Sequence, residues 1–161
     1  VLHLNIISVA AADGVPLQWE VRKPAGCKAL FGEALAVSLP ASGPMPVIRI
    51  RYETTEKSTA ICWFTPDQTQ GKAHPLVFTQ SQAICGRSLM PCQDTPCVKQ
   101  PFTWRMTVPR PLTAVCSGQR CGGVETELKR TFAYKQDIPV MSYLLAVIIG
   151  DLEERPIGPR S

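Results

Sequence analysis

Three cysteines, an arginine and two glutamines gather in the stretch FTQSQAICGRSLMPCQDTPCVK, which runs from Phe78 to Lys99. Thiolates are nucleophiles and zinc ligands, and a glutamine amide can accept a hydrogen bond from a cation or donate one to an anion. By residue type the stretch could therefore be a metal site, a catalytic turn or a binding edge.

A metal site is the least supported of the three. The chain has two histidines and seven cysteines, at positions 27, 62, 85, 92, 97, 116 and 121. Cys92 with Cys97 and Cys116 with Cys121 could be imagined as a zinc cage, but no C-x-x-C pair occurs, and we expect inert buried thiols instead. An odd cysteine count also favours free thiols and a reducing, cytoplasmic compartment.

Catalytic constellations are missing as well. The sequence has no G-x-S-x-G turn and no glycine-rich phosphate loop. His3 falls in an expected strand and His74 in a proline-flanked loop, and neither has a partner in sequence. Cys85 near His74 could suggest a thiol nucleophile, but a buried structural cysteine is the simpler interpretation. We expect no catalytic residue, metal or cofactor in this chain.

Composition predicts one folded domain over residues 1–161, because 45% of the residues are hydrophobic and 19% are charged. The net charge of +4 comes from scattered basic residues, which argues against nucleic-acid binding. The apolar run Tyr143–Gly150 is shorter than the roughly 20 residues that span a bilayer, so no membrane span is expected. The opening VLHLNIISVAAA lacks a Met and a basic leader, and its alternation predicts a half-buried strand of a chain trimmed at its front.

Period-two alternation recurs between turns and predicts many short strands. The expected strands cover residues 17–21, 35–39, 48–53, 61–64, 102–108, 112–116, 128–134 and 143–150, with a turn at 40–46. We expect 102–108 to pair with 112–116 across the corner Pro109–Pro111. The best helical candidate is Ala83–Leu89, which Pro91 ends. The fold class is therefore all-β, with mainly antiparallel or mixed sheets and at most one or two short helical turns.

Two segments carry a family resemblance: CWFTPDQTQGKAHPLVFTQSQAICGRSLMPCQDTPCVK (62–99) and RTFAYKQDIPVMSYLLAVIIGDLEERPIGPRS (130–161). They closely resemble zinc aminopeptidases of the gluzincin type, in the branch of leukotriene A-4 hydrolase and aminopeptidase B. The resemblance implies that residues 1–161 are a saddle-shaped, non-catalytic N-terminal β domain. It also implies a longer enzyme whose zinc domain, with a His-Glu-x-x-His motif, is not in this chain.

In that family the positions of Gln80, Gln82 and Ala83 line the substrate cleft near the free amine of the peptide. The resemblance thus implies two partners, the catalytic domain of the same polypeptide and the N-terminus of a peptide substrate. It implies zinc in the parent enzyme. The alternative is that Gln80 and Gln82 only satisfy backbone groups at a strand end.

Other residues of the stretch suggest architecture. Asp94 before Thr95 and Pro96 suits an Asx-type turn, and Arg87 can serve nearby carbonyls or a carboxylate. The chain departs from the hydrolase pattern at Cys85, Gly86 and Cys97, which leaves epoxide hydrolysis open. A second hypothesis is a stand-alone β-sandwich interaction module with no enzymatic parent.

Overall fold

The computed structural model describes residues 1–23, 25–26, 31–39 and 47–158. Its strands are β1 (Leu4–Ala11), β2 (Trp19–Arg22), β3 (Ala34–Val37), β4 (Ile48–Thr54), β5 (Ile61–Phe64), β6 (Leu76–Thr79), β7 (Lys99–Pro109), β8 (Thr113–Cys116), β9 (Gln119–Glu125), β10 (Lys129–Met141) and β11 (Val147–Gly150). Single 3-10 turns occur at η2 (Pro66–Gln68), η3 (Gly86–Ser88) and η4 (Ser142–Leu144). The all-β fold class is confirmed, and the described residues contain at least three short helical turns where at most two were expected. Within these ranges, no helix has the length and apolarity that crossing a membrane requires.

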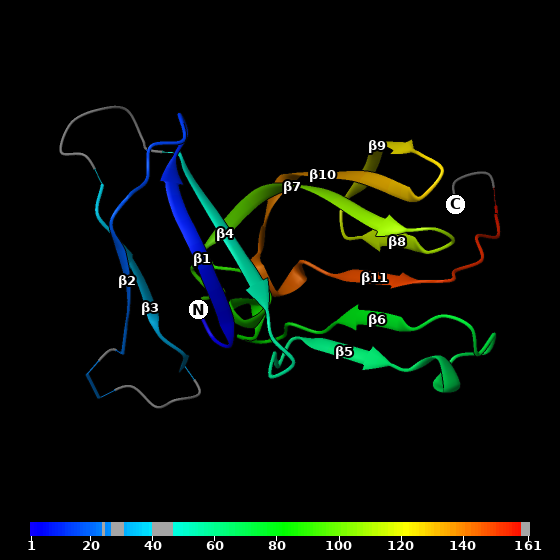
Figure 1. Ribbon diagram of the computed structural model, residues 1–161, viewed down its shortest axis with the longest axis horizontal. Coiled ribbons are helices and arrows are strands. Elements are labelled where there is room, and N and C mark those ends of the chain that lie inside the picture. The colour runs from blue at the N-terminus through cyan, green and yellow to red at the C-terminus, as the bar shows by residue number, and fades with distance from the viewer. Residues whose placement is uncertain (24, 27–30, 40–46, 159–161) are drawn as a thin grey trace.

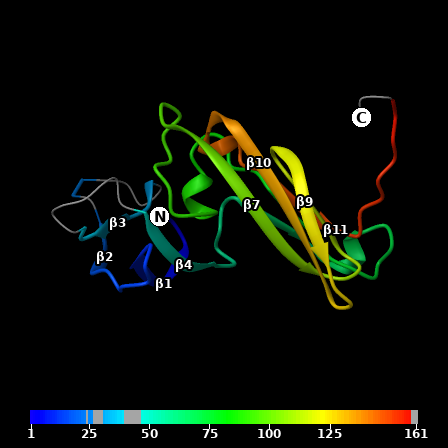
Figure 2. The ribbon, with the colours of Figure 1, turned by 90° about the horizontal axis from the view of Figure 1, so that it is seen from above.

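Within the described part of the chain, the strands form four antiparallel sheets, which Figure 1 shows as two groups. The two-stranded sheets β1-β4 and β2-β3 lie on the N-terminal side. On the other side lie a three-stranded sheet, β7-β10-β9, and a four-stranded sheet, β5-β6-β11-β8. Seen from above, β7, β10 and β9 form one layer that crosses in front of β11 (Figure 2).

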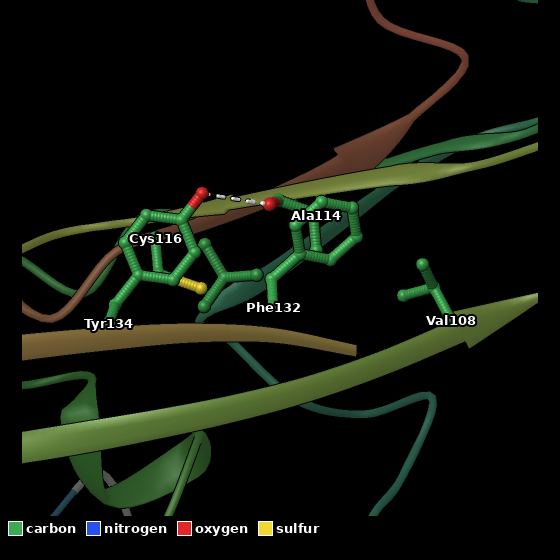
Figure 3. Close-up of a cluster of buried hydrophobic side chains, with 6 residues drawn as sticks. Val108, Ala114, Cys116, Phe132 and Tyr134 are labelled. Carbon is green, nitrogen blue, oxygen red and sulfur yellow. Dashed lines mark hydrogen bonds between the residues drawn. The ribbon is translucent and has the colours of Figure 1, made fainter. Parts of the chain in front are cut away.

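The two larger sheets pack face to face, and the core lies between them (Figure 3). The three-stranded sheet contributes Val108, Phe132 and Tyr134, and the four-stranded sheet contributes Ala114, Cys116 and Val147. The Tyr134 hydroxyl donates a hydrogen bond to the Ala114 carbonyl at 3.1 Å, which joins the layers. Fully burying a large apolar side chain contributes about 1.5–3 kcal/mol. This inter-sheet core holds β11, and β6, which leads to Gln80, pairs with β11.

The pairing expected across Pro109–Pro111 is wrong. β7 pairs with β10, with Met106 opposite Phe132, and β8 pairs with β11, with Cys116 opposite Val147. The corner carries the chain from one layer to the other instead of closing a hairpin. The physical reason is that β8 buries its apolar face, including Cys116, against the opposite sheet.

Two further expectations differ from the structure in detail, and a third is not tested. Ala83–Leu89 forms only turns and the short η3, because the Arg87 amide donates to the Asp94 side chain instead of to a carbonyl of a preceding turn. The expected strand 143–150 is shortened to β11 by η4 at its start, and β11 lies between β6 and β8 in its sheet. The turn at 40–46 lies outside the described residues.

Candidate functional site

The candidate residues follow directly on the end of β6. The backbone N–H of Gln80 donates a hydrogen bond to the Ala60 carbonyl at 2.8 Å, which extends the β5-β6 ladder by one residue. Gln80 and Gln82 are exposed, whereas Ser81 between them is 2% exposed. This alternation places both glutamine side chains on the solvent side. Ala83 is exposed as well and follows a cis peptide bond, so all three predicted residues are accessible on one short segment.

The two glutamines differ in what their side chains bind. The backbone amide of Gln82 donates to Gln80 Oε1 at 3.0 Å, so the Gln80 carbonyl oxygen serves the backbone. For Gln80, the alternative that the side chain satisfies a backbone group at a strand end therefore applies. Within the described ranges, the Gln82 side chain makes no hydrogen bond of its own. Its side-chain amide group is free to bind a ligand.

An ion pair between Arg87 and Asp94 anchors the segment that follows. Asp94 Oδ2 accepts from Arg87 Nε at 3.0 Å, and the two side chains are 15% and 2% exposed. Arg87 also donates to the carbonyls of Asp94, at 2.9 Å, and Phe31, at 2.6 Å, as the sequence predicted for an arginine here. The expected Asx turn is wrong, because the second carboxylate oxygen of Asp94 accepts from the Ser142 hydroxyl at 2.5 Å. The anchor therefore ties this segment to η4.

A second anchor lies inside the candidate segment. The Ser81 carbonyl accepts a hydrogen bond from the Cys85 amide at 2.9 Å, which closes the turn after Gln82. The buried Ser81 hydroxyl has no hydrogen-bond partner among the residues that the structure places. Ser81 thus fixes the backbone, and its neighbours on either side present the accessible side chains.

The described residues do not fit a metal centre. Across residues 1–158 with the gaps given above, no three His, Cys, Asp or Glu side chains could share a metal ion. Six cysteines are unpaired thiols, and Cys27 lies outside the described residues. Burial raises the pKa of Cys92 and of Cys116 to about 11, so both stay protonated at neutral pH and are poor ligands and nucleophiles.

The two histidines offer no base for a nucleophile. His3 is exposed with a positive φ of 56°, and His74 is half-buried in the loop before β6. In the described part of the chain, neither imidazole takes part in a hydrogen bond or an ion pair with Cys85 or another side chain. Among the described residues, Cys85 therefore has no histidine base beside it.

Sequence reasoning did not indicate a hollow of about 960 Å³ between β3, β4 and β7. Its lining includes Cys92 and Trp104, but none of Gln80, Gln82 and Ala83. The hollow depends on how three sheets lie against one another, for which a single sequence carries no local signal. It is separate from the candidate site.

Comparisons with known proteins agree with this arrangement. Residues 2–144 match the family described as the peptidase M1 N-terminal domain. The leucine aminopeptidase 2 of Aspergillus terreus is 40% identical over 99% of this chain and 26% of its own length. The leukotriene A-4 hydrolase of Xenopus laevis is 39% identical over 81% of this chain and 22% of its own length.

Solved structures agree with the fold. Native yeast LTA4 hydrolase superposes with a TM-score of 0.85 and 34% identity over 99% of this chain and 24% of its own. An M1 zinc metallopeptidase of Deinococcus radiodurans gives a TM-score of 0.70 and 25% identity over 93% of this chain and 33% of its own. The chain thus spans about a quarter of the curated relatives it matches, at 26% and 22%. A stand-alone module with no enzymatic parent is not favoured, since the chain belongs to the family of peptidase M1 N-terminal domains.

Proposed function

We propose that this chain forms one wall of the substrate cleft of a zinc aminopeptidase, and that Gln82 binds the free amine of the peptide substrate. The observation that carries the proposal is the exposed, unengaged side chain of Gln82 on a backbone fixed by Gln80 Oε1. The aminopeptidase and zinc metallopeptidase names of the relatives support the reaction class.

The chemistry of the pair suits an ammonium ligand. A peptide N-terminus that carries a proton has only donors, so it requires acceptor oxygens, and the Gln82 carbonyl is one. Hydrogen bonds to charged groups contribute about 1.5–3 kcal/mol, more than those between neutral groups. The small side chain of Ala83 next to Gln82 leaves room for the residue that carries the amine. Gln80 takes a positioning role, because its side-chain oxygen accepts a hydrogen bond from the backbone N–H of Gln82.

The remaining parts of the reaction belong to the catalytic domain of the same polypeptide. That domain would hold the zinc, which polarises the scissile carbonyl and activates water when it is bound. The described residues of this chain contribute no cluster of metal ligands and act on substrate position alone. The unpaired thiols support a cytoplasmic location for the parent enzyme.

The test replaces Gln82 by alanine in the full-length enzyme. We expect kcat/KM for an aminoacyl substrate to fall roughly tenfold to a hundredfold, because each 1.36 kcal/mol is a factor of ten. Gln119→Ala is the matched control, since Gln119 is an exposed glutamine on β9, and it should leave turnover unchanged. Zinc content is measured in parallel and should be equal in the unsubstituted enzyme, Gln82→Ala and Gln119→Ala.

The stability of the same variants separates recognition from scaffolding. An unengaged, exposed Gln82 predicts that the urea midpoint of Gln82→Ala stays that of the parent. Unchanged turnover with a clearly lower midpoint would refute the recognition role and make Gln82 a structural residue.

A further inference from the structure

The loop 80–88, which carries the candidate residues, is attached at both ends to the short stretch of chain just before β5. At its start, the backbone N–H of Gln80 donates a hydrogen bond to the Ala60 carbonyl at 2.8 Å. At its end, the hydroxyl oxygen of Ser88 accepts a hydrogen bond from the backbone N–H of Thr59 at 2.9 Å. Neighbouring residues before β5 therefore hold both the first and the last residue of the loop.

Two serine hydroxyls complete the attachment at the end of the loop. The Ser58 hydroxyl donates to the Ser88 carbonyl at 2.7 Å, and the Ser88 hydroxyl donates to Ser58 Oγ at 3.1 Å. Ser58 Oγ also accepts a hydrogen bond from the backbone N–H of Ala60 at 3.4 Å. Each hydroxyl thus uses its one proton and its oxygen as well. We call Ser58, Ser88 and the backbone of Thr59 and Ala60 the serine clamp.

Burial makes the serine clamp rigid. Ser88 and Ala60 are both 0% exposed, so water does not compete for the hydrogen bonds at these residues. A buried polar group that loses its partner keeps the cost of having left water. Alternative positions of the loop, in which these bonds are broken, are therefore disfavoured.

Two backbone hydrogen bonds connect the position of Ser88 to that of Gln82. The backbone N–H of Ser88 donates to the Cys85 carbonyl, and the backbone N–H of Cys85 donates to the Ser81 carbonyl, each at 2.9 Å. Ser81 is 2% exposed and directly precedes Gln82 in the chain. Because the two turns share Cys85, a displacement of Ser88 shifts the backbone beside Gln82.

We propose that Ser88 and Ser58 are positioning residues for amine binding, because the serine clamp fixes where the loop presents Gln82 relative to Gln80. A hydrogen bond to an ammonium group weakens steeply when its distance or angle is wrong, so the place of the Gln82 carbonyl decides how well the amine is bound. Neither serine touches the substrate. The inference rests on the proposed function and names the residues through which the fold supports it.

The first test is Ser88→Ala in the full-length enzyme, with steady-state kinetics on an aminoacyl anilide. We expect KM to rise roughly threefold to tenfold and kcat to stay within about twofold, because the substrate amine is bound alike in the ground state and the transition state. The rise should not exceed that in Gln82→Ala, since the clamp acts through Gln82. Equal zinc content in all the variants shows that the same amount of loaded enzyme is compared.

A double substitution shows whether the serine acts through Gln82. In the Gln82→Ala enzyme, Ser88→Ala should raise KM no further, because residues that act as one unit are not additive. Ser58→Ala is a second, milder variant, since it leaves the bond between Thr59 and Ser88 in place. It should also raise KM, and also only in the presence of Gln82.

Ser117→Ala is the matched control. Ser117 Oγ accepts a hydrogen bond from the backbone N–H of Ala146 at 3.0 Å, the same kind of bond that Ser88 makes with Thr59. Ser117 follows β8, which lies at the opposite edge of the four-stranded sheet from β5. Its removal should therefore leave KM unchanged.

Three results would overturn the inference. An equal rise in KM with and without Gln82 would show that the serines act elsewhere. A lower kcat with unchanged KM in both serine variants would mean that only active enzyme is lost. Equal effects of Ser88→Ala and Ser117→Ala would reduce the clamp to general stability. Unchanged kcat/KM in Gln82→Ala would refute the proposed function itself, whereas an impaired Gln82→Ala with additive serine effects would refute the positioning role alone.

Discussion

One oxygen of the Asp94 carboxylate, Oδ2, accepts hydrogen bonds from both the backbone amide and the Nε of Arg87, at 2.9 and 3.0 Å. The two residues are seven positions apart, and the bond closes the loop that begins just after Gln82 and Ala83. Because the Asp94 side chain is only 2% exposed, its charge has little water to compensate it if the arginine is removed.

Arg87→Met should therefore lower the free energy of unfolding by about 3–5 kcal/mol, the usual cost of leaving a buried charge unpaired. The measurement is urea denaturation followed by circular dichroism. Arg110→Met is the matched control, because Arg110 pairs with Glu125 where the side chains are 45% and 50% exposed. Exposed pairs contribute about 0–1 kcal/mol. Equal losses in the two variants would contradict a special role of the Asp94 pair.

The bond between the two large sheets is testable at Tyr134. Tyr134→Phe removes the hydroxyl that donates to the Ala114 carbonyl and should cost about 0.5–1.5 kcal/mol in thermal or urea unfolding. Tyr52→Phe on β4 is the control, since the Tyr52 hydroxyl makes no hydrogen bond within the described residues. A change no larger than that of the control would mean that apolar packing alone joins the layers.

Alkaline pH should destabilise the domain through Cys116. Burial raises its pKa from about 9 to about 11, so the folded state holds the neutral thiol while the unfolded state ionises. The stabilisation is fully present below pH 9 and is lost as pH rises through 11, to a total of about 2–3 kcal/mol. Burial acts in the same direction on the pKa of Cys92, so the Cys116→Ala variant isolates the share of Cys116.

The measurement compares unfolding free energies at pH 7, 9 and 10.5. The curve of Cys116→Ala should be flatter above pH 9 than that of the parent, although the variant is less stable at every pH because of the cavity it creates. Parallel curves would show that the Cys116 thiol is not the group that titrates.

Thiol titration tests the redox state. Protein unfolded without a reductant should return nearly all of its seven cysteines as free thiols. Recovery of only one thiol would mean three disulfides and would contradict a reducing compartment.

The sequence predicted strand positions better than strand partners. The alternation of Phe102, Trp104 and Met106 reports which side of one strand is buried, and β7 forms there. The partner of Leu112–Cys116 depends on which layer that segment joins. Its alternation is the same whether β8 pairs with β7 or packs against β7 from the opposite sheet, so the local pattern could not decide.

The candidate site was located by resemblance, but the roles within it were not. Gln80 and Gln82 look alike in sequence, and only the fold shows that Gln80 Oε1 accepts the Gln82 amide. The sequence carries a partial signal for burial along the four-stranded sheet. Ile61–Phe64 and Val147–Gly150 are apolar at nearly every position, the pattern of strands covered on both faces. Every residue of Val147–Gly150 is buried or half-buried, but Cys62, Trp63 and Phe64 are exposed.

The contact between β6 and β11 also constrains how the sequence can vary. A Cβ atom at Gly150 would lie 2.6 Å from Leu76 Cδ1, so the Leu76 side chain occupies the space that any larger residue at position 150 would need. The two positions belong to different strands and are far apart in the chain, yet a side chain at position 150 would overlap the side chain of Leu76. Among relatives, a side chain at the position of Gly150 should therefore accompany a shorter residue at the position of Leu76. An independent change at either position would disturb the packing between β6 and β11.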